Sequence, residues 1–380
     1  MEIFTTESHR AALKRKISDA ASDDFIRIRA ELGAEADICL RHPLYSVTFS
    51  ETRAVSGNPH DYYSEGPYWW PDPKNPGGPF IRRDGEVYPG RIDRHGSDMS
   101  KMINDVYILS AAGAMLGRTE CTARADELLC TWFLNDATKM NPHLEYAQAI
   151  FGHCTGRGIG IIDTVMLIKL IAAMELFTMC PDTESTTAGI KEWFAAYLNW
   201  MDTSKNGIEE RDYKNNHATW WNAQAASYAA FIGDRAMLDK CFDRFVNFTI
   251  PSQQADDGSF PLEIQRTKSY SYSMYNLDAC AVTAEVAHHY GVDLWNKVCA
   301  DGKGMAKALE FMFPYYEDPS LWKHQQIVRI SNGPSLSFIL GAVRVSDKYA
   351  EAAKRGCSGR RYFSSGVGIG APCMIEGCLF

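Results

Sequence analysis

From residue 99 to residue 356 the sequence keeps to one pattern: apolar residues recur at helical spacing, and short turns of Gly, Pro and Asp interrupt them. Such spacing predicts amphipathic or buried helices. The alternation of apolar and polar residues that marks half-buried strands is scarce. Helices that have no sheet to cover them must pack on one another. The pattern therefore predicts an all-α fold.

Paired antiparallel helices in a chain of 380 residues favour an incomplete (α/α) toroid, or barrel, with long active-site loops over a simple bundle. No polar linker divides the chain, so we expect a single domain over residues 1–380. The segment 158–180 is apolar enough to be buried all round. The segments that we expect to contain helices are 1–40, 99–117, 122–135, 158–180, 186–204, 217–233, 235–250, 276–292, 302–316 and 333–356.

Residues 41–98 break the helical pattern. Pro, Gly, Tyr and Trp crowd together there, most densely in YYSEGPYWWPDP at residues 62–73. Long loops in an ordered chain are usually functional or disordered, and the many aromatic residues argue against disorder. Two interpretations of residues 62–73 stay open: an aromatic plug on the helix ends, or a lid that faces a substrate.

The charge balance limits the class of partner. A net charge of −8 with a pI near 5.7 argues against a general nucleic-acid-binding surface, although a few arginines in a cleft could still bind an anionic substrate. No run of about 18 apolar residues occurs, so we expect no membrane span. The N-terminus has no apolar signal core, and the compartment stays open, because an export signal could have been removed.

Metal and nucleophile motifs are not recognisable. The eleven cysteines form no CxxC pair, and we expect most of them to be buried free thiols. HExxH is absent, and the adjacent His288 and His289 suggest no ligand partner at helical i, i+4 spacing. No P-loop, dinucleotide fingerprint or serine elbow occurs either. The sequence therefore predicts neither a metal site nor a cofactor.

Polar residues gather in two loops before predicted helices. In the loop at 139–164, Gln148, His153 and Arg157 fit the edge of a cleft, although capping and turn formation could account for half of its polar residues. Asn215, Asn216 and His217 stand at the start of an apolar helix. One Asn is enough for a helix cap. Two interpretations of the second Asn and the His stay open: further capping with a satisfied buried histidine, or a role in a site.

A further cluster lies at residues 260–279. Glu263, Arg266 and Lys268 precede Tyr270 and Tyr272 there. A charged run entering a helix with closely spaced tyrosines is unusual, although any one of these tyrosines alone could be structural.

Four segments, taken together and in order, resemble the alginate lyase family of (α/α)-toroid polysaccharide lyases. The resemblance is closest to polysaccharide lyase family 38, which is similar to family 5. The segments span about residues 62–279 and read YYSEGPYWWPDP, MNPHLEYAQAIFGHCTGRGIGIIDT, NNHATWW and PLEIQRTKSYSYSMYNLDA. The resemblance implies a toroid fold, a polysaccharide lyase without cofactor, and an anionic polysaccharide or oligosaccharide as its partner.

The resemblance also implies roles for four residues. It places Asn216, His217 and Arg266 beside a substrate carboxylate and assigns proton transfer to a tyrosine. Tyr272 matches that tyrosine because it directly precedes the turn Ser-Met-Tyr-Asn-Leu at 273–277. Tyr270 is its competitor.

The chemistry of β-elimination needs residues of these types. Removing H5, which lies α to the uronate carboxylate, builds up a second negative charge that N–H donors and cations have to stabilise. A tyrosine near Arg, Lys or protonated His is expected to have a lowered phenol pKa, which would make phenolate accessible. In mannuronate and glucuronate, H5 and the C4 oxygen lie on the same side, so one tyrosine could serve both. In guluronate they lie on opposite faces, and His217 would be the second residue.

The resemblance extends to residues that bind the substrate. We expect the loop residues to line sugar subsites and the aromatic residues of 62–73 to stack on sugar or form the lid. The candidate substrate-binding residues are Tyr68, Trp69, Trp70, Gln148, His153, Arg157, Glu263, Lys268 and Tyr270.

Three functions stay open at this stage. The first is a lyase acting on β-1,4-linked polyuronate, either poly-mannuronate (alginate) or glucuronan. The second is a glycoside hydrolase on the same toroid, which would need two facing carboxylates. The third is a non-catalytic carbohydrate-binding protein. The carboxylates considered for the second are Glu65, Asp72, Glu145 and Glu263.

Overall fold

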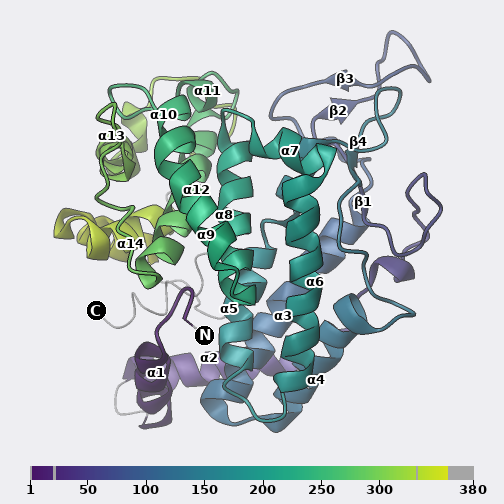
Figure 1. Cartoon of the computed structure of the whole chain (residues 1–380), viewed down its shortest axis with the longest axis vertical. Helices are drawn as coiled ribbons and strands as arrows, with labels where there is room; N and C mark the ends of the chain where they lie inside the picture. Colours follow the sequence, from purple (N-terminus) through teal and green to yellow (C-terminus); the bar gives the residue numbers. More distant parts are fainter. Residues whose placement is uncertain (1, 20–22, 331–332, 358–380) are drawn as a thin grey trace.

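The computed structural model describes residues 2–19, 23–330 and 333–357. Helices dominate, and four short strands lie in the loops that precede α3 and α5 (Figure 1). The helices are α1 (Glu7–Asp19), α2 (Asp23–Cys39), α3 (Arg94–Leu116), α4 (Thr119–Leu129), α5 (Leu167–Phe177), α6 (Glu184–Thr203), α7 (Lys205–Arg211), α8 (Asn216–Ile232), α9 (Arg235–Arg244), α10 (Ile250–Gln253), α11 (Pro261–Ile264), α12 (Ser269–His289), α13 (Met305–Glu317), α14 (Leu336–Arg344) and α15 (Ala350–Cys357). The strands are β1 (Tyr63–Glu65), β2 (Trp69–Trp70), β3 (Ile81–Arg82) and β4 (Tyr146–Ala149).

The helices form an inner and an outer layer. In the inner layer α3 packs on α5, α5 on α8, and α8 on α12. Helices α2 and α4 contact α3, α6 and α9 contact α8, and α13 and α14 contact α12. Every residue of α5 is buried. This confirms the burial predicted for segment 158–180 over Leu167–Phe177 only, because Ile159 and Ile162 are partly exposed and Thr178 is exposed. This layering confirms the predicted all-α (α/α) toroid.

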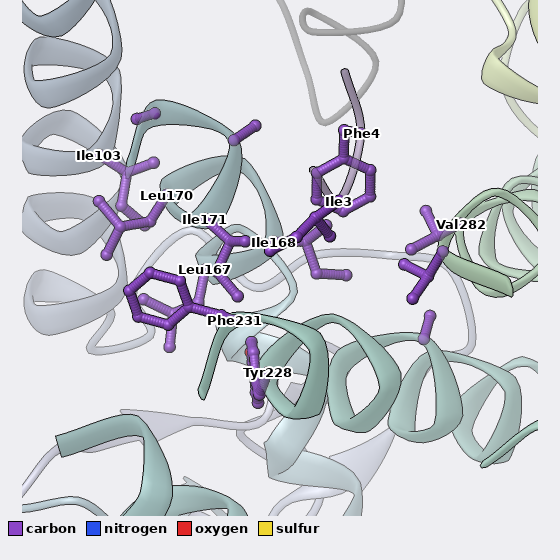
Figure 2. Close-up of a cluster of buried hydrophobic side chains, with 14 of the residues drawn as sticks. Ile3, Phe4, Ile103, Leu167, Ile168, Leu170, Ile171, Tyr228, Phe231 and Val282 are labelled. Carbon is purple, nitrogen blue, oxygen red and sulfur yellow. The ribbon is translucent and has the colours of Figure 1, made fainter. Parts of the chain in front are cut away.

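Figure 2 shows where the inner helices meet. Side chains from α3, α5, α8 and α12 converge there, and the first residues of the chain reach into the same core (Figure 2). The backbone N–H groups of Ile3 and Phe4 donate to the buried Glu175 carboxylate at 2.6 and 3.3 Å. The labelled side chains are Ile3, Phe4, Ile103, Leu167, Ile168, Leu170, Ile171, Tyr228, Phe231 and Val282.

Local sequence signals set the ends of α8. Asn215 caps its N-terminus, with the side-chain oxygen accepting from the His217 backbone N–H at 3.2 Å. Gly233 follows its last turn with φ of +84°, a conformation that glycine adopts without strain. Asn215 is thus the capping residue, and Asn216 is the first residue of the helix.

Several predicted helix bounds are wrong. Helix α5 begins at Leu167, and Gly158–Thr164 before it is a 3-10 helix. Helix α12 begins at Ser269 rather than at residue 276. Helix α3 begins at Arg94 rather than at residue 99, and the i, i+4 ion pair between Arg94 and Asp98 lies in its added first turn. The segment 333–356 is split into α14 and α15, because Ser346 accepts from the backbone N–H of Lys348 and starts a 3-10 turn.

The segment 41–98 is irregular, as predicted, and two small sheets organise it. Strand β1 pairs with β4 in parallel, with Tyr63 opposite Tyr146. Strands β2 and β3 form an antiparallel pair, with Trp69 opposite Arg82. The loop before α3 therefore lies beside the loop before α5, next to α7 in Figure 1. Within the described residues, no helix is long and apolar enough to cross a membrane.

Candidate active site

A pocket of about 570 Å³ lies where the irregular loops meet the first residues of α8 and α12. Its walls combine three arginines, a histidine and several aromatic rings. The lining residues are Pro67, Tyr68, Trp69, Arg82, Gln148, Arg157, Ile159, Ile162, Asp163, Tyr213, Asn215, Asn216, His217, Arg266, Tyr272 and Tyr275. The four residues predicted for catalysis, Asn216, His217, Arg266 and Tyr272, thus share one cavity.

The buried carboxylate of Glu210 holds the His217 ring in place. Its Nδ1 lies 2.9 Å from Oε1 of Glu210, which stands near the end of α7 and is fully buried. Burial raises the pKa of Glu210, and the neighbouring His217 opposes that shift. We assign the Nδ1 proton to this bond. Nε2 is then the ring nitrogen available to the pocket.

Asn216 is bound to a second buried carboxylate. Its Nδ2 donates to both oxygens of Glu263 at 2.8 Å, and its backbone N–H donates to Oε1 at 2.6 Å. The two hydrogens of an amide diverge too widely for both to reach one carboxylate at this distance. At most one hydrogen of the Asn216 amide therefore remains for a substrate.

Arg266 connects the helical side of the pocket to the segment at residues 62–84, which contains β2 and β3. We call this segment the lid, and its role as a lid stays a prediction. Nε and Nη2 of Arg266 donate to Asp84, which follows β3, at 3.1 and 2.7 Å. The backbone N–H of Thr267 donates to the same carboxylate at 3.2 Å. The guanidinium of Arg266 also lies 3.9 Å from the centroid of the Tyr272 ring, close enough for a cation–π contact. The arginine is thus fixed from both sides.

Tyr272 contacts Tyr68 across the pocket lining. Its hydroxyl donates to the hydroxyl of Tyr68 at 2.6 Å. Burial raises the pKa of Tyr272 above its usual value, Tyr68 adds to the rise, and Arg266 opposes it. The expectation of a lowered phenol pKa is therefore wrong for this state, because desolvation outweighs the nearby cation. Tyr272 carries its proton at neutral pH.

Gln148 and Arg157 form another part of the pocket wall. Gln148 has a φ of +50°, uncommon for a residue with a side chain. Its backbone and side-chain oxygens both accept from Arg157, at 3.1 and 2.8 Å, while its Nε2 donates to Asp163 at 2.8 Å. A Cβ added at Gly66 would lie 3.0 Å from Nη2 of Arg157. The glycine thus leaves room for this guanidinium.

Comparison with known proteins gives the pocket a family. The family model for alginate lyase matches residues 47–322. The chain belongs to the alginate lyase family. A solved structure of an alginate lyase from Bacteroides ovatus is 31% identical, with a TM-score of 0.88, over 98% of this chain and 98% of that chain.

More distant members share the fold. Alginate lyase A1-III from Sphingomonas species A1 is 16% identical with a TM-score of 0.56, covering 94% of this chain and 89% of that one. A variant of A1-III complexed with tetrasaccharide is also 16% identical, with a TM-score of 0.57 over 90% and 88% of the two chains. No curated protein matches the chain. Family membership makes this chain a polysaccharide lyase.

Several residues that the sequence analysis predicts to bind substrate do not line the pocket. The indole N–H of Trp70 donates to the carbonyl of Glu86 at 2.9 Å. Nε2 of His153 lies 2.8 Å from the carbonyl oxygen of Phe80. Lys268 stands 5.8 Å from the Tyr68 ring centroid. Tyr270 is buried with its ring edge-on to Trp322. Glu263 does not line the pocket either, and its carboxylate accepts from Asn216.

Other residues of the pocket escaped the sequence analysis. Arg82 and Tyr213 line it, and the ring centroid of Tyr213 lies 5.7 Å from that of His217. Glu210 stands seven positions before His217, but on a separate helix, α7, so its closeness along the chain was the available signal. Asp84 and Asp163 carry no such signal, because they reach the site only through tertiary packing.

The prediction that most cysteines are buried free thiols is tested in part. Six of the cysteines are buried and two are partly exposed, all as free thiols, while the structure does not describe the side chains of Cys357, Cys373 and Cys378.

The prediction that His289 has no ligand-type partner at i, i+4 spacing is wrong. Glu285, one turn earlier, lies 3.5 Å away. That carboxylate accepts from Arg344 and Trp295, which gives it structural partners.

Proposed function

We propose that this chain cleaves β-1,4-linked polyuronate, with alginate as the first candidate, by β-elimination. The observation that carries the proposal is the convergence of Asn216, His217, Arg266 and Tyr272 in one cavity with two further arginines, Arg82 and Arg157. A cavity rich in cations and N–H donors suits a chain of carboxylates. Family membership and the solved A1-III variant complexed with tetrasaccharide support the same substrate class.

The substrate carboxylate would be neutralised at the N-terminus of α8. His217 and Asn216 stand in its first turn, where the helix dipole favours an anion. Asn216 can give one N–H, and Arg266 brings a full positive charge beside Tyr272. Because these groups are held by Glu210, Glu263 and Asp84, they need little rearrangement when charge develops on the enolate-like intermediate.

The elimination then needs one base and one acid. H5 leaves as a proton, its electron pair forms the C4–C5 double bond, the C4–O4 bond breaks, and O4 receives a proton. The protonated Tyr272 suits the acid. For guluronate, Nε2 of His217 on the other side is the base, because Nδ1 is committed to Glu210. For mannuronate or glucuronate, Tyr272 would serve both steps. It would first lose its own proton to solvent, and the phenolate would then take H5 and pass that proton to O4.

Hydrolysis is the less favoured alternative. It needs two carboxyl groups facing each other across the bond that breaks. Among the described residues that line the pocket, Asp163 is the only carboxylate, and it accepts from Ser64 and Gln148 at 2.5 and 2.8 Å. A non-catalytic binding protein would have no need for an acid held against a tyrosine partner. The geometry therefore favours elimination.

The decisive experiment is a polymer screen with an absorbance readout for unsaturated uronate. We expect a rise with poly-mannuronate or poly-guluronate, and no rise with Tyr272→Phe. Glucuronan and hyaluronan in the same screen test the sugar specificity, and sizing of the products separates endo from exo action. Reducing ends released without the absorbance rise would show hydrolysis and overturn the proposal.

A further inference from the structure

A second cluster of chemically reactive side chains lies away from the pocket. Cys39 ends α2, His42 follows three residues later, and Asp105 stands in the middle of α3. Their ligand atoms, Sγ, a ring nitrogen and a carboxylate oxygen, all lie within 4.8 Å of one another. None of the three residues lines the pocket. We propose that this cluster binds a divalent transition metal, with zinc as the best fit.

The type of donor decides which metal fits. A thiolate, an imidazole and a carboxylate together are a usual ligand set for Zn²⁺, whereas Ca²⁺ and Mg²⁺ require a shell of oxygen atoms. Nδ1 of His42 lies 3.0 Å from both oxygens of Asp105, and ligand atoms on one tetrahedral zinc ion are about 3.3 Å apart. A small movement of the His42 and Asp105 side chains away from each other would therefore make room for the ion between them.

The surroundings keep the three residues in place. The Tyr45 hydroxyl donates to Oδ2 of Asp105 at 3.2 Å, as an outer partner of a ligating carboxylate does. Arg124 donates to the backbone carbonyl of His42 at 2.5 Å, and the backbone N–H of His42 donates to the carbonyl of Cys39 at 3.1 Å. The turn that carries two of the ligands is thus fixed by contacts that leave their ligand atoms available.

The site has both a dry side and an open side. Cys39 and Asp105 are buried, whereas 41% of the His42 side chain is exposed. Metal can therefore arrive from solvent, and water can take the fourth position. Zinc binds the thiolate form of cysteine, so zinc binding at Cys39 would release a proton.

The position of the cluster suggests a structural role. Cys39 and His42 stand at the beginning of the irregular segment 41–98, and Asp105 stands in the helix that follows it. An ion bound to all three would join the two ends of the segment that carries the lid, and would reduce the freedom of the unfolded chain across that loop. This inference does not depend on the proposed reaction.

Cobalt binding tests the site without any assay of activity. We expect the reduced protein to bind one equivalent of Co²⁺ with a thiolate-to-metal absorption band, and Zn²⁺ to displace it and raise the melting temperature. His42→Gln, at a half-exposed position, should keep the fold and weaken binding at least tenfold. Cys39→Ser should remove the thiolate band, whereas Cys121→Ser, another buried free thiol, should leave it unchanged.

Two outcomes would overturn the proposal. One is a wild-type protein that shows no thiolate band with Co²⁺ at a concentration tenfold above that of the protein. The other is a band that survives in both His42→Gln and Cys39→Ser, which would place the metal elsewhere. Circular dichroism of each variant separates loss of the site from loss of the fold.

Discussion

The two sides of the pocket are built differently. On the helical side, Asn216 and His217 rest on Glu263 and Glu210, whose side chains are 1% and 0% exposed. On the lid side, Asp84 meets Arg266 with 20% of its side chain exposed, and Tyr68 reaches Tyr272 through a single hydroxyl contact. One side is fixed by buried charge, and the other is held by partly exposed contacts.

This difference separates two tasks. Groups that must stabilise developing charge gain most when their own partners are buried and already in place. Groups that let a polymer enter and leave need contacts that open at low cost, which partly exposed ion pairs provide. We therefore expect substitutions on the helical side to change the chemical step, and substitutions on the lid side to change mainly the apparent affinity for polymer.

The largest effect is expected at the hydroxyl pair that joins the two sides. Tyr272→Phe should lower kcat about 10³-fold, because it removes the proton donor. Tyr68→Phe, which deletes the lid's half of the same hydrogen bond, should lower kcat/KM only about fivefold, in line with a loss of about 1 kcal/mol. Tyr270→Phe is the control, since Tyr270 packs against Trp322 away from the pocket. Equal losses from Tyr272→Phe and Tyr68→Phe would contradict the division of tasks.

Asn216→Ala should reduce both turnover and stability. It leaves the buried Glu263 without its side-chain donor, which should lower the free energy of unfolding by about 3 kcal/mol. Asn215→Ala should lower it by about 1 kcal/mol, the usual value of an N-cap, with turnover retained. Chemical denaturation and initial rates check both variants. A fully stable Asn216→Ala protein would show that Glu263 has another partner.

Glu210→Gln should lower kcat by about 10- to 100-fold, the range found for carboxylate partners of metal-bound histidines, because the amide no longer fixes the His217 tautomer. Stability at neutral pH should change little or rise. The raised pKa of Glu210 shows that the fold disfavours the ionised carboxylate above the pKa of the unfolded state. Glu209→Gln, which removes the exposed neighbouring charge, should match the wild type. A parallel loss of kcat and stability in Glu210→Gln would indicate a structural role instead.

The sequence predicted the helical side better than the lid side, and for a physical reason. Periodicity predicts helices, and Asn216, His217 and Tyr272 occupy the first turns of α8 and α12, so their convergence follows from helix packing. The contacts of Asp84 and Tyr68 depend on how an irregular segment folds back over nearly 200 residues, which no local pattern encodes. The raised pKa of Tyr272 was missed because sequence shows its charged neighbours but not its burial.

The smallest effect is expected at the lid's ion pair. Burial raises the pKa of Asp84, but hydrogen bonds from Arg266 and Thr267 outweigh it and hold the pKa well below its ordinary range. A depressed folded-state pKa means that the pair's contribution is present above the unfolded pKa of about 4 and is lost only as pH falls through the folded value. Between about pH 5 and 8, therefore, the change in KM that Asp84→Asn causes should not depend on pH.

Asp84→Asn should raise KM about fivefold with kcat nearly unchanged, since a partly exposed ion pair contributes about 1 kcal/mol. Arg82 lies on the same hairpin, and Asp84→Asn also removes the exposed ion pair between Arg82 and Asp84 at 2.8 Å. Arg82→Gln removes that pair but keeps Asp84, so it is the matched comparison. Because salt screens such pairs, the difference between wild type and Asp84→Asn should shrink at high ionic strength. A large fall in kcat at constant KM would show that Asp84, through Arg266, belongs with the catalytic side of the pocket.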